Sequence, residues 1–417
     1  MDRIILHIDF DSYFASCEQQ FNQSLRGKPI GVTAQNGRTC IIAASREAKK
    51  LGVKSPSRTF DALEIVPNIV FVPAHFEKYW EITQKFLNIC KDYSPYVELF
   101  SLDEVFMDIS STQDLFGGKY ELINKIRERI KNEIGEYITV SVGISHNKLL
   151  AKLASGLKKP NGIFEITSQN LEEVYANCKL TDICGIGGRI AKRLNRFSIY
   201  TLLELKNFNS DKLRAEFGRV YSKFLQNVAL GFDDSKVIPY YEESETKSVG
   251  RNYCLPQNEY DKKVVFQNIF ELCEELGIKL RRLSKKAKTA GIYLGGSRSI
   301  SARKTAGDYF DSGEKVFNTC MDILKQNNFE LEDNDYVRRI SIWVGNLEDK
   351  QNLTLSLFDT SDRKEKILQT VDRINEKFGD HTIRNGFLLY SQKLTTVPNG
   401  FLADRYERAK LSKTIFS

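Results

Sequence analysis

The sequence predicts a multidomain α+β protein, and three observations support this prediction. The chain has 417 residues, which is too long for a single ordinary core. Strand-like and helix-like runs alternate up to about residue 165, a purely helical pattern follows, and a second strand and helix pattern comes after it. No stretch approaches the roughly 18 uncharged apolar residues of a membrane span. The first apolar run meets charge too early for a secretory signal, so we expect a cytoplasmic protein with no membrane segment.

The first region reads as a sheet layer with helices packed on it. Short runs rich in branched apolar residues predict strands, and longer amphipathic runs predict helices. The expected strands are 4–8, 30–33, 40–43, 97–100, 105–109 and 138–142, and the expected helices are 13–20, 76–91 and 146–157.

The next regions differ in pattern. Residues 166–232 are expected to be small and all-helical, with a sharp turn at Gly185-Ile186-Gly187-Gly188. The polar, acidic run 239–244 suits a linker. Residues 246–347 read as strand, helix, two strands, helix and strand, which is the order of a ferredoxin-like unit. The expected helices of this part are 261–283, 312–326 and, in a polar tail that follows, 363–378.

Composition limits the function only weakly. The eight cysteines are scattered without a CxxC pair, and the four histidines are also far apart. We therefore expect reduced thiols and no structural zinc site. The formal net charge of +7 permits a polyanionic partner without requiring one, because solubility alone accounts for such a charge.

Two acidic motifs point to metal chemistry. Asp9 comes at the end of an apolar strand, where a sheet edge opens to solvent. Asp103 and Glu104 are adjacent at a tight reversal between two apolar strands. Neighbouring carboxylates repel each other, so placing both near a turn is costly unless a divalent cation neutralises them. For either motif taken alone, a solvated pair of acids at a hairpin tip is an equally good explanation, but the two together favour a Mg²⁺ site.

Several segments in fixed order resemble the Y-family, or DinB/UmuC-type, translesion DNA polymerases of bacteria. The run Asp9-Phe10-Asp11-Ser12-Tyr13-Phe14-Ala15-Ser16 and the run Ser101-Leu102-Asp103-Glu104 carry the resemblance most clearly. It covers residues 1 to about 347. Further matching segments are 47–53, 139–145, 147–162 and 183–188.

The resemblance implies an error-prone enzyme that adds deoxynucleotides to a primer 3′-hydroxyl opposite damaged template DNA, without proofreading. It also implies a palm with an antiparallel sheet and helices, small fingers, a helix-hairpin-helix thumb and a ferredoxin-like little finger domain. The implied boundaries are 1–17 and 75–165 for the palm, 18–74 for the fingers, 166–232 for the thumb, 233–245 for a linker, 246–347 for the little finger and 348–417 for a tail.

The same resemblance assigns roles near the acids. Asp9, Asp103 and Glu104 are implied to be the catalytic metal ligands for two Mg²⁺ ions, with the backbone carbonyl of Phe10 as a further ligand. Two ions of this kind would activate the 3′-hydroxyl and stabilise the leaving pyrophosphate.

Nucleotide-binding roles are implied for five further residues. Tyr13 lies where the backbone approaches the incoming triphosphate, and Phe14 takes the place of the aromatic gate that excludes a ribose 2′-hydroxyl. Lys49 and Lys159 match basic positions that grip the triphosphate. Arg46 stands where DinB-type members carry a tyrosine, so it either contacts phosphate or points to solvent, and the subfamily stays open.

Two segments are expected to bind primer-template DNA. Gly185 and Gly187 let the backbone approach a phosphate, and Arg189 and Lys192 follow on the next helix. A simple glycine turn between helices is the alternative.

The second segment is the stretch Lys279–Lys304, which contains nine basic residues and no acidic one. A solvated charged face is its usual explanation, yet a run without acids favours phosphate contact. Its candidate DNA-binding residues are Lys285, Lys286, Arg298 and Arg303.

A short apolar motif follows the last expected domain. Leu353-Thr354-Leu355-Ser356-Leu357-Phe358 resembles the peptide with which bacterial polymerases bind the sliding clamp, although Thr354 stands where glutamine is usual. Leu355, Leu357 and Phe358 would fill an apolar pocket of the clamp. The alternative is a short edge strand. The expected partners are primer-template DNA, deoxynucleoside triphosphates and this clamp, and the protein is expected to be a monomer.

Two other classes of protein remain open from the residues alone. A nucleotidyl cyclase would share the sheet and its acids, but it would need neither the glycine turn nor the basic module. A catalytically silent DNA-binding or clamp-docking protein would need the basic surfaces, but it would have no use for Asp9, Asp103 and Glu104 together.

Overall fold

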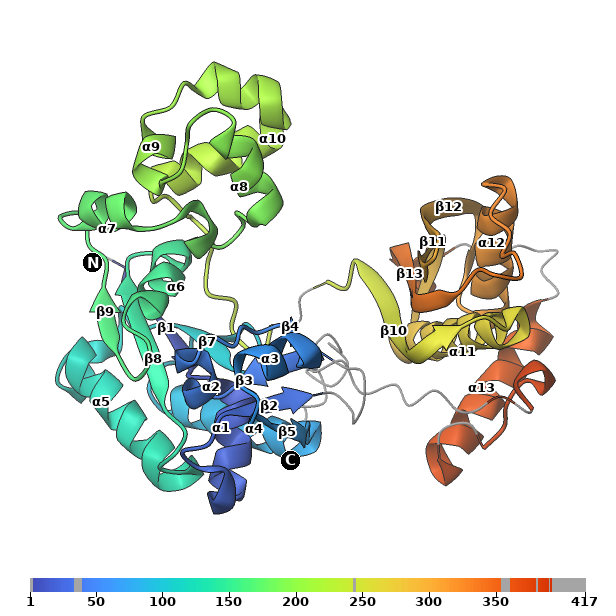
Figure 1. Cartoon of the computed structure of the whole chain (residues 1–417), viewed down its shortest axis with the longest axis horizontal. Helices are drawn as coiled ribbons and strands as arrows, with labels where there is room; N and C mark the ends of the chain where they lie inside the picture. Colours follow the sequence, from blue (N-terminus) through green and yellow to red (C-terminus); the bar gives the residue numbers. More distant parts are fainter. Residues whose placement is uncertain are drawn as a thin grey trace. The chain divides into compact units, whose positions relative to one another are not determined.

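The computed structural model of the chain describes residues 3–33, 40–242, 245–353, 361–379, 382–389 and 391 (Figure 1). The chain divides into two compact units, and the described residues of the first end at Glu242 while those of the second begin at Glu245. No helix among the described residues is long and apolar enough to cross a membrane.

A mixed sheet with helices on both faces forms the centre of the first unit. Its strand order is β6-β7-β1-β8-β9, and all neighbours are antiparallel except the β8–β9 pair. The side chains of Leu6 and Ile8 point to one face and share a core with helices α1, α4 and α5. Those of Ile5 and His7 point to the other face, which α6 covers. The strands are β1 (Ile5–Phe10), β6 (Val97–Leu99), β7 (Glu104–Asp108), β8 (Val140–Ser145) and β9 (Ile163–Glu165), and the helices are α1 (Tyr13–Phe21), α4 (Phe76–Lys91), α5 (Lys119–Arg129) and α6 (Lys148–Leu157).

Helix α6 lies unusually close to β8 because Gly143 has no side chain. A Cβ at this position would lie 2.0 Å from the carbonyl oxygen of Ala151 and 2.3 Å from the amide nitrogen of Ser155. The close approach brings the polar residues of α6 up to the acids on β1 and β7.

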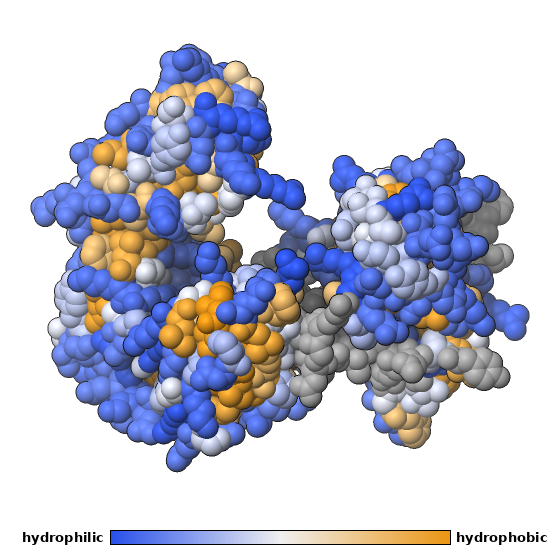
Figure 2. Space-filling model, viewed as in Figure 1, coloured by the Kyte–Doolittle hydropathy of each residue, from blue (hydrophilic) through white to orange (hydrophobic). Residues whose placement is uncertain are grey.

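A second, smaller sheet has the order β4-β3-β2-β5. The sequence predicted β2 and β3, whereas β4, β5 and helix α3 are too short or too irregular in pattern for a prediction. Figure 2 shows apolar side chains gathered on the surface of this layer, where Phe60, Leu63 and Ile65 of α3 are exposed. The elements are β2 (Ile30–Thr33), β3 (Cys40–Ala44), α2 (Arg46–Lys50), β4 (Ser57–Arg58), α3 (Thr59–Ile65) and β5 (Val70–Pro73).

Residues 166–232 are helical, as the sequence predicted. The segment that follows lies against the central sheet: Val237 is buried with Ile5, and the amide of Tyr240 donates to the carbonyl of Val97 at 2.8 Å. Much of the expected linker is therefore anchored to the first unit. The helices are α7 (Leu171–Asn177), α8 (Gly188–Asn195), α9 (Leu202–Lys206) and α10 (Ser210–Ala229).

The second unit is a four-stranded antiparallel sheet with two helices. Its element order is β10-α11-β11-β12-α12-β13, as predicted, and its strand order is β10-β13-β11-β12. Helices α11 and α12 bury their apolar sides against one face of the sheet. The bounds are β10 (Ser248–Glu259), α11 (Lys262–Arg282), β11 (Lys285–Gly296), β12 (Ser299–Phe310), α12 (Gly313–Gln326) and β13 (Val337–Asp349), with a further helix, α13, at Ser361–Phe378.

Candidate active site

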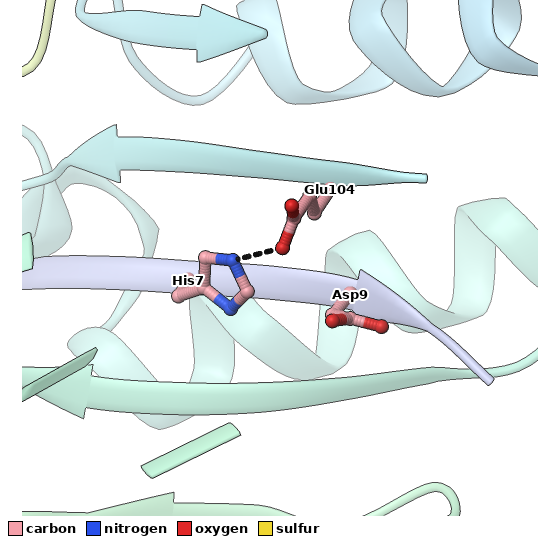
Figure 3. Close-up of side chains that lie close together, drawn as sticks. All are labelled: His7, Asp9 and Glu104. Carbon is pink, nitrogen blue, oxygen red and sulfur yellow. Dashed lines mark hydrogen bonds and ion pairs between the residues drawn. The ribbon is translucent and has the colours of Figure 1, made fainter. Parts of the chain in front are cut away.

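Strand pairing brings the two acidic motifs together. Asp9 on β1 lies directly opposite Glu104 on β7, and His7 lies on the same side of β1 as Asp9 because alternate residues of a strand share a face. One ligand atom from each of His7, Asp9 and Glu104 lies within 4.8 Å of the others (Figure 3). His7 was not predicted as a site residue, although its position two residues before Asp9 on the same strand places it on the same face.

The carboxylate of Glu104 is held by two basic groups. Its Oε2 atom accepts a hydrogen bond from Nε2 of His7 at 2.9 Å, and Nζ of Lys152 on α6 contacts the same oxygen. Burial acts to raise the pKa of Glu104, but the hydrogen bond from His7 and the charge of Lys152 outweigh it and hold the pKa at about 2. Glu104 is therefore ionised at neutral pH. Burial lowers the pKa of His7.

The pKa values of Asp9 and Asp103 are raised, whereas that of Glu104 is lowered. Burial raises the pKa of Asp9, while the charge of Lys159, whose Nζ contacts Oδ1 of Asp9, opposes this shift. Burial also raises the pKa of Asp103, although Ser101 Oγ donates to its Oδ1 at 2.5 Å. The charges of Asp9 and Asp103 act on each other, so a cation between them would relieve both repulsion and desolvation.

A tight turn places Lys159 at this site. The amide of Asn161 donates to Oδ2 of Asp11 at 2.8 Å, which ties the turn to the segment after β1. Asn161 has a left-handed backbone with φ of 57°, and a Cβ at Gly162 would lie 1.9 Å from the carbonyl oxygen of Lys158. Asp11 therefore holds the turn. The group of metal-ligand candidates among the described residues is His7, Asp9 and Glu104, so the structure brings two of the three predicted acids into it, and both Asp11 and Asp103 lie outside it.

The two aromatic residues after β1 occupy different surroundings. Tyr13 is a core residue, and its hydroxyl donates to the carbonyl of Tyr79 at 2.6 Å. The ring of Phe14 is only partly buried and stacks on the ring of Tyr79, with centroids 4.6 Å apart and planes 18° apart. Phe14 thus has a fixed orientation.

Arg46 and Lys49 both lie on α2 but point to different surroundings. Nη2 of Arg46 donates to Oγ1 of Thr139 at 2.7 Å and to the carbonyl of Tyr137 at 3.4 Å, so Arg46 links α2 to the start of β8 instead of pointing to solvent. Desolvation and the charge of Lys159 lower the pKa of Lys49, while the charges of Asp9, Asp11 and Asp103 raise it. These interactions with the acids indicate that the Lys49 ammonium lies near the acidic site.

The turn before α8 requires a glycine at position 185. Its φ is 97°, and a Cβ there would lie 2.3 Å from the ring of Phe224. Gly187 is the N-cap of α8, and Arg189 and Lys192 are exposed. The carbonyl of Gly185 accepts a hydrogen bond from the hydroxyl of Tyr221 at 2.7 Å, so the turn is fixed within the first unit while the two basic side chains are exposed.

Several basic residues of the acid-free stretch have acidic partners from outside it. Nζ of Lys285 lies 2.9 Å from Asp349, and Nζ of Lys286 lies 3.7 Å from Glu365 of α13. Arg298 lies 3.4 Å from Asp335. Arg298 and Arg303 are both exposed, whereas Lys285 and Lys286 are partly buried, and Arg303 lies on the edge strand β12.

The predicted clamp peptide lies outside the described residues, apart from Leu353. The predicted clamp-binding residues Leu355, Leu357 and Phe358 therefore stay a prediction from the sequence.

Acids and lysines at one end of a central sheet suit the binding of a divalent cation and of phosphate groups. Comparison with known proteins identifies the family. The model of the impB/mucB/samB family matches residues 8–156, and that of the impB/mucB/samB family C-terminal domain matches residues 246–357.

The chain is 31% identical over 406 residues to DNA polymerase IV of Acetivibrio thermocellus, which covers 95% of this chain and 100% of that protein. It is 31% identical over 410 residues to DNA polymerase IV of Pelotomaculum thermopropionicum, covering 97% of this chain and 98% of the relative. The structure is also similar to a Y-family DNA polymerase chimera, Dbh-Dpo4(243-245)-Dbh, with a TM-score of 0.69 and 26% identity over 82% of this chain and 98% of that chain. The chain belongs to the impB/mucB/samB family and, with it, to the Y-family DNA polymerases.

Proposed function

We propose that this chain is an error-prone translesion DNA polymerase that adds deoxynucleotides to a primer 3′-hydroxyl opposite damaged template DNA and does not proofread. One observation carries the proposal: Asp9, Glu104 and Lys159, which are far apart in the sequence, meet at one end of the central sheet in a member of a DNA polymerase family. A nucleotidyl cyclase or a silent accessory protein fits this combination less well.

The acidic residues suit divalent cations. Asp9 and Asp103 are largely buried carboxylates whose charges act on each other, and such a pair favours a bound cation. We assign Asp9, Asp103, Glu104 and the carbonyl of Phe10 as ligands of two Mg²⁺ ions. When bound, such ions lower the pKa of the attacking hydroxyl and neutralise charge on the leaving pyrophosphate.

The remaining groups of the site bind and orient the nucleotide. Lys159 and Lys49 bind the triphosphate, and their ammonium charges offset the charge that develops on pyrophosphate. Tyr13 fixes the backbone that approaches the triphosphate, and Phe14, backed by Tyr79, lies under the sugar and excludes a 2′-hydroxyl. Arg46 supports this site by joining α2 to the strand that follows Thr139.

Sequence-independent contacts hold the DNA. We assign residues 1–17 and 75–165 to the palm, 18–74 to the fingers, 166–232 to a helix-hairpin-helix thumb, 233–245 to a connection and 246–347 to a ferredoxin-like little finger. The last segment has the β-α-β-β-α-β element order of a ferredoxin-like unit, which supports its assignment. Its strand order β10-β13-β11-β12 differs from that of a ferredoxin-like sheet, because the second strand, β11, is central and the third, β12, lies at the edge. The DNA-binding residues are Gly185, Gly187, Arg189 and Lys192 in the thumb, and Lys285, Lys286, Arg298 and Arg303 in the little finger.

The polymerase is proposed to act as a cytoplasmic monomer that binds the sliding clamp through 353–358 in the tail 348–417. Binding of this peptide would raise the effective concentration of the enzyme at the primer end.

Primer extension with Mg²⁺ tests the central proposal. We expect Asp103→Ala or Glu104→Ala to abolish extension and to leave primer-template binding largely intact, because affinity comes mostly from basic surfaces. Asp114→Ala, at an exposed acid of the same unit, is the matched control. Wild-type extension rates in the Asp103 or Glu104 variant would contradict the assignment, and cyclic product from a triphosphate without DNA would favour a cyclase.

A further inference from the structure

We propose that His7 is a positioning residue that holds the carboxylate of Glu104 in the orientation in which it binds metal. This inference rests on the proposed function, because it concerns the same metal site. His7 is completely buried on the face of β1 that carries Asp9, and it contacts one of the three acids directly.

Both nitrogen atoms of the His7 ring are engaged. Nε2 is 2.9 Å from Oε2 of Glu104, and Nδ1 is 2.7 Å from Oγ of Ser155 on α6. An ionised carboxylate can only accept hydrogen bonds, so Nε2 must be protonated and donate a hydrogen bond to Glu104. In neutral histidine the other nitrogen then accepts from the hydroxyl of Ser155.

The ring has little freedom to turn away from Glu104. It packs on the ring of Phe106, its neighbour across the β1–β7 pair, with centroids 4.6 Å apart. Ser155 comes from α6, which the absence of a side chain at Gly143 allows to lie against the sheet. Three elements, β1, β7 and α6, therefore fix the direction of the hydrogen bond to Glu104.

The same geometry argues against His7 as a metal ligand. Imidazole nitrogen is an ordinary ligand for transition metals, and one His7 nitrogen lies within 4.8 Å of the carboxylate oxygens. However, one ring nitrogen is taken up by Glu104 and the other by Ser155. His7 thus acts through Glu104: by occupying Oε2 it leaves Oε1 free for a cation, which is the usual role of a hydrogen-bonded group behind a metal ligand.

Lys152 contacts the same oxygen of Glu104 as His7 does, but the two basic groups differ in mobility. Lys152 is a partly exposed side chain on a flexible stem, whereas His7 is a rigid and completely buried ring. The lysine can move away when a cation binds, and the histidine cannot. Loss of His7 should therefore affect metal affinity even though Lys152 remains.

Direct measurement of Mn²⁺ binding tests this inference without relying on activity. The protein would carry a dideoxy-terminated primer-template and the matching deoxynucleotide, and free Mn²⁺ would be quantified by electron paramagnetic resonance. His7→Leu removes the donor and keeps an apolar side chain, so we expect Mn²⁺ binding to weaken about 10- to 100-fold. His7→Gln places an amide nitrogen near the position of Nε2, so it should bind Mn²⁺ within about threefold of wild type.

Controls separate a local effect from misfolding. His146→Gln changes an exposed histidine of the same unit and should bind Mn²⁺ as wild type does. Ser155→Ala keeps the contact between His7 and Glu104 but removes the support behind it, and we expect a loss intermediate between His7→Gln and His7→Leu. If His7→Leu does not fold, Ser155→Ala replaces it in the test. Thermal melts and measurements of primer-template affinity show which variants are folded.

The outcomes are distinct. Wild-type Mn²⁺ affinity in His7→Leu, or in Ser155→Ala if His7→Leu does not fold, overturns the positioning role. Equal weakening in His7→Leu and His7→Gln, with imidazole nitrogen coupling in the Mn²⁺ spectrum of the wild type, overturns it in favour of direct ligation. If Glu104→Gln itself binds Mn²⁺ as tightly as wild type, the proposed metal site fails, and the failure is not specific to His7.

Discussion

Lys159 and Asp9 are 150 residues apart in the chain, yet Nζ of Lys159 contacts Oδ1 of Asp9. The contact depends on the turn that Asp11 holds through Asn161. It joins a residue proposed to bind triphosphate to a residue proposed to bind metal, so replacing Lys159 should also change the pKa of Asp9.

Replacing Lys159 should therefore reduce nucleotide use. We expect Lys159→Ala to lower kcat/KM for the incoming deoxynucleotide by about 10- to 100-fold, because one charge-assisted contact to phosphate is lost. Steady-state single-nucleotide insertion measures this. Lys158→Ala is the matched control, since the Lys158 ammonium lies 5.3 Å from the ring of Phe164. Equal effects of the two variants would remove Lys159 from the site.

The same variant should change the pH dependence. The charge of Lys159 lowers the pKa of Asp9 against the effect of burial, so removal of that charge raises the pKa of Asp9 further. Asp9 must be ionised to hold metal, and a higher pKa means that it becomes protonated at a higher pH. We expect the acidic limb of the pH profile of kcat/KM to move upward in Lys159→Ala and to return in Lys159→Arg. An acidic limb at the wild-type position in Lys159→Ala would contradict this.

The stacked position of Phe14 leads to a prediction about sugar choice. Without the ring, the sugar would have room for a 2′-hydroxyl, so Phe14→Ala should raise insertion of rCTP relative to dCTP opposite guanine by on the order of 10- to 100-fold. Phe21→Ala removes an exposed ring from the same helix and should leave the ratio unchanged. An unaltered ratio in Phe14→Ala would make its stacking on Tyr79 purely structural.

The ion pairs of the second unit predict unequal roles for its basic residues. Arg303→Ala should weaken primer-template binding and reduce the slope of log affinity against log salt by about one. Lys286→Ala should have a smaller effect, because Glu365 already neutralises part of that charge. Fluorescence anisotropy at several salt concentrations distinguishes the two variants. A larger loss in Lys286→Ala would show that Glu365 does not compete with DNA.

The motif 353–358 predicts a partner. Leu357→Ala combined with Phe358→Ala should remove stimulation by the sliding clamp on a long template and spare basal synthesis, because the pair would fill an apolar pocket of the clamp. Extension assays with and without loaded clamp measure this. If the double variant responds to the clamp as wild type does, the clamp binds elsewhere on the chain.

The sequence by itself determined the elements that depend on local pattern. The helix 76–91 was predicted with the bounds that the structure has, because its apolar residues recur at helical spacing over four turns. The order of strands and helices in the second unit follows from the same local signals. The adjacency of Asp103 and Glu104 made a site for a cation visible without any knowledge of the fold.

Only the tertiary structure decided which distant groups meet. The register of β1 against β7 places Asp9 opposite Glu104 and brings His7 within reach of it, and no local pattern specifies that register. The acid-free stretch gave no sign of acidic partners, yet Nζ of Lys286 lies 3.7 Å from Glu365 of α13, a helix far along the chain. Secondary structure reflects interactions between near neighbours, whereas the state of a charge depends on every group that folding brings close to it.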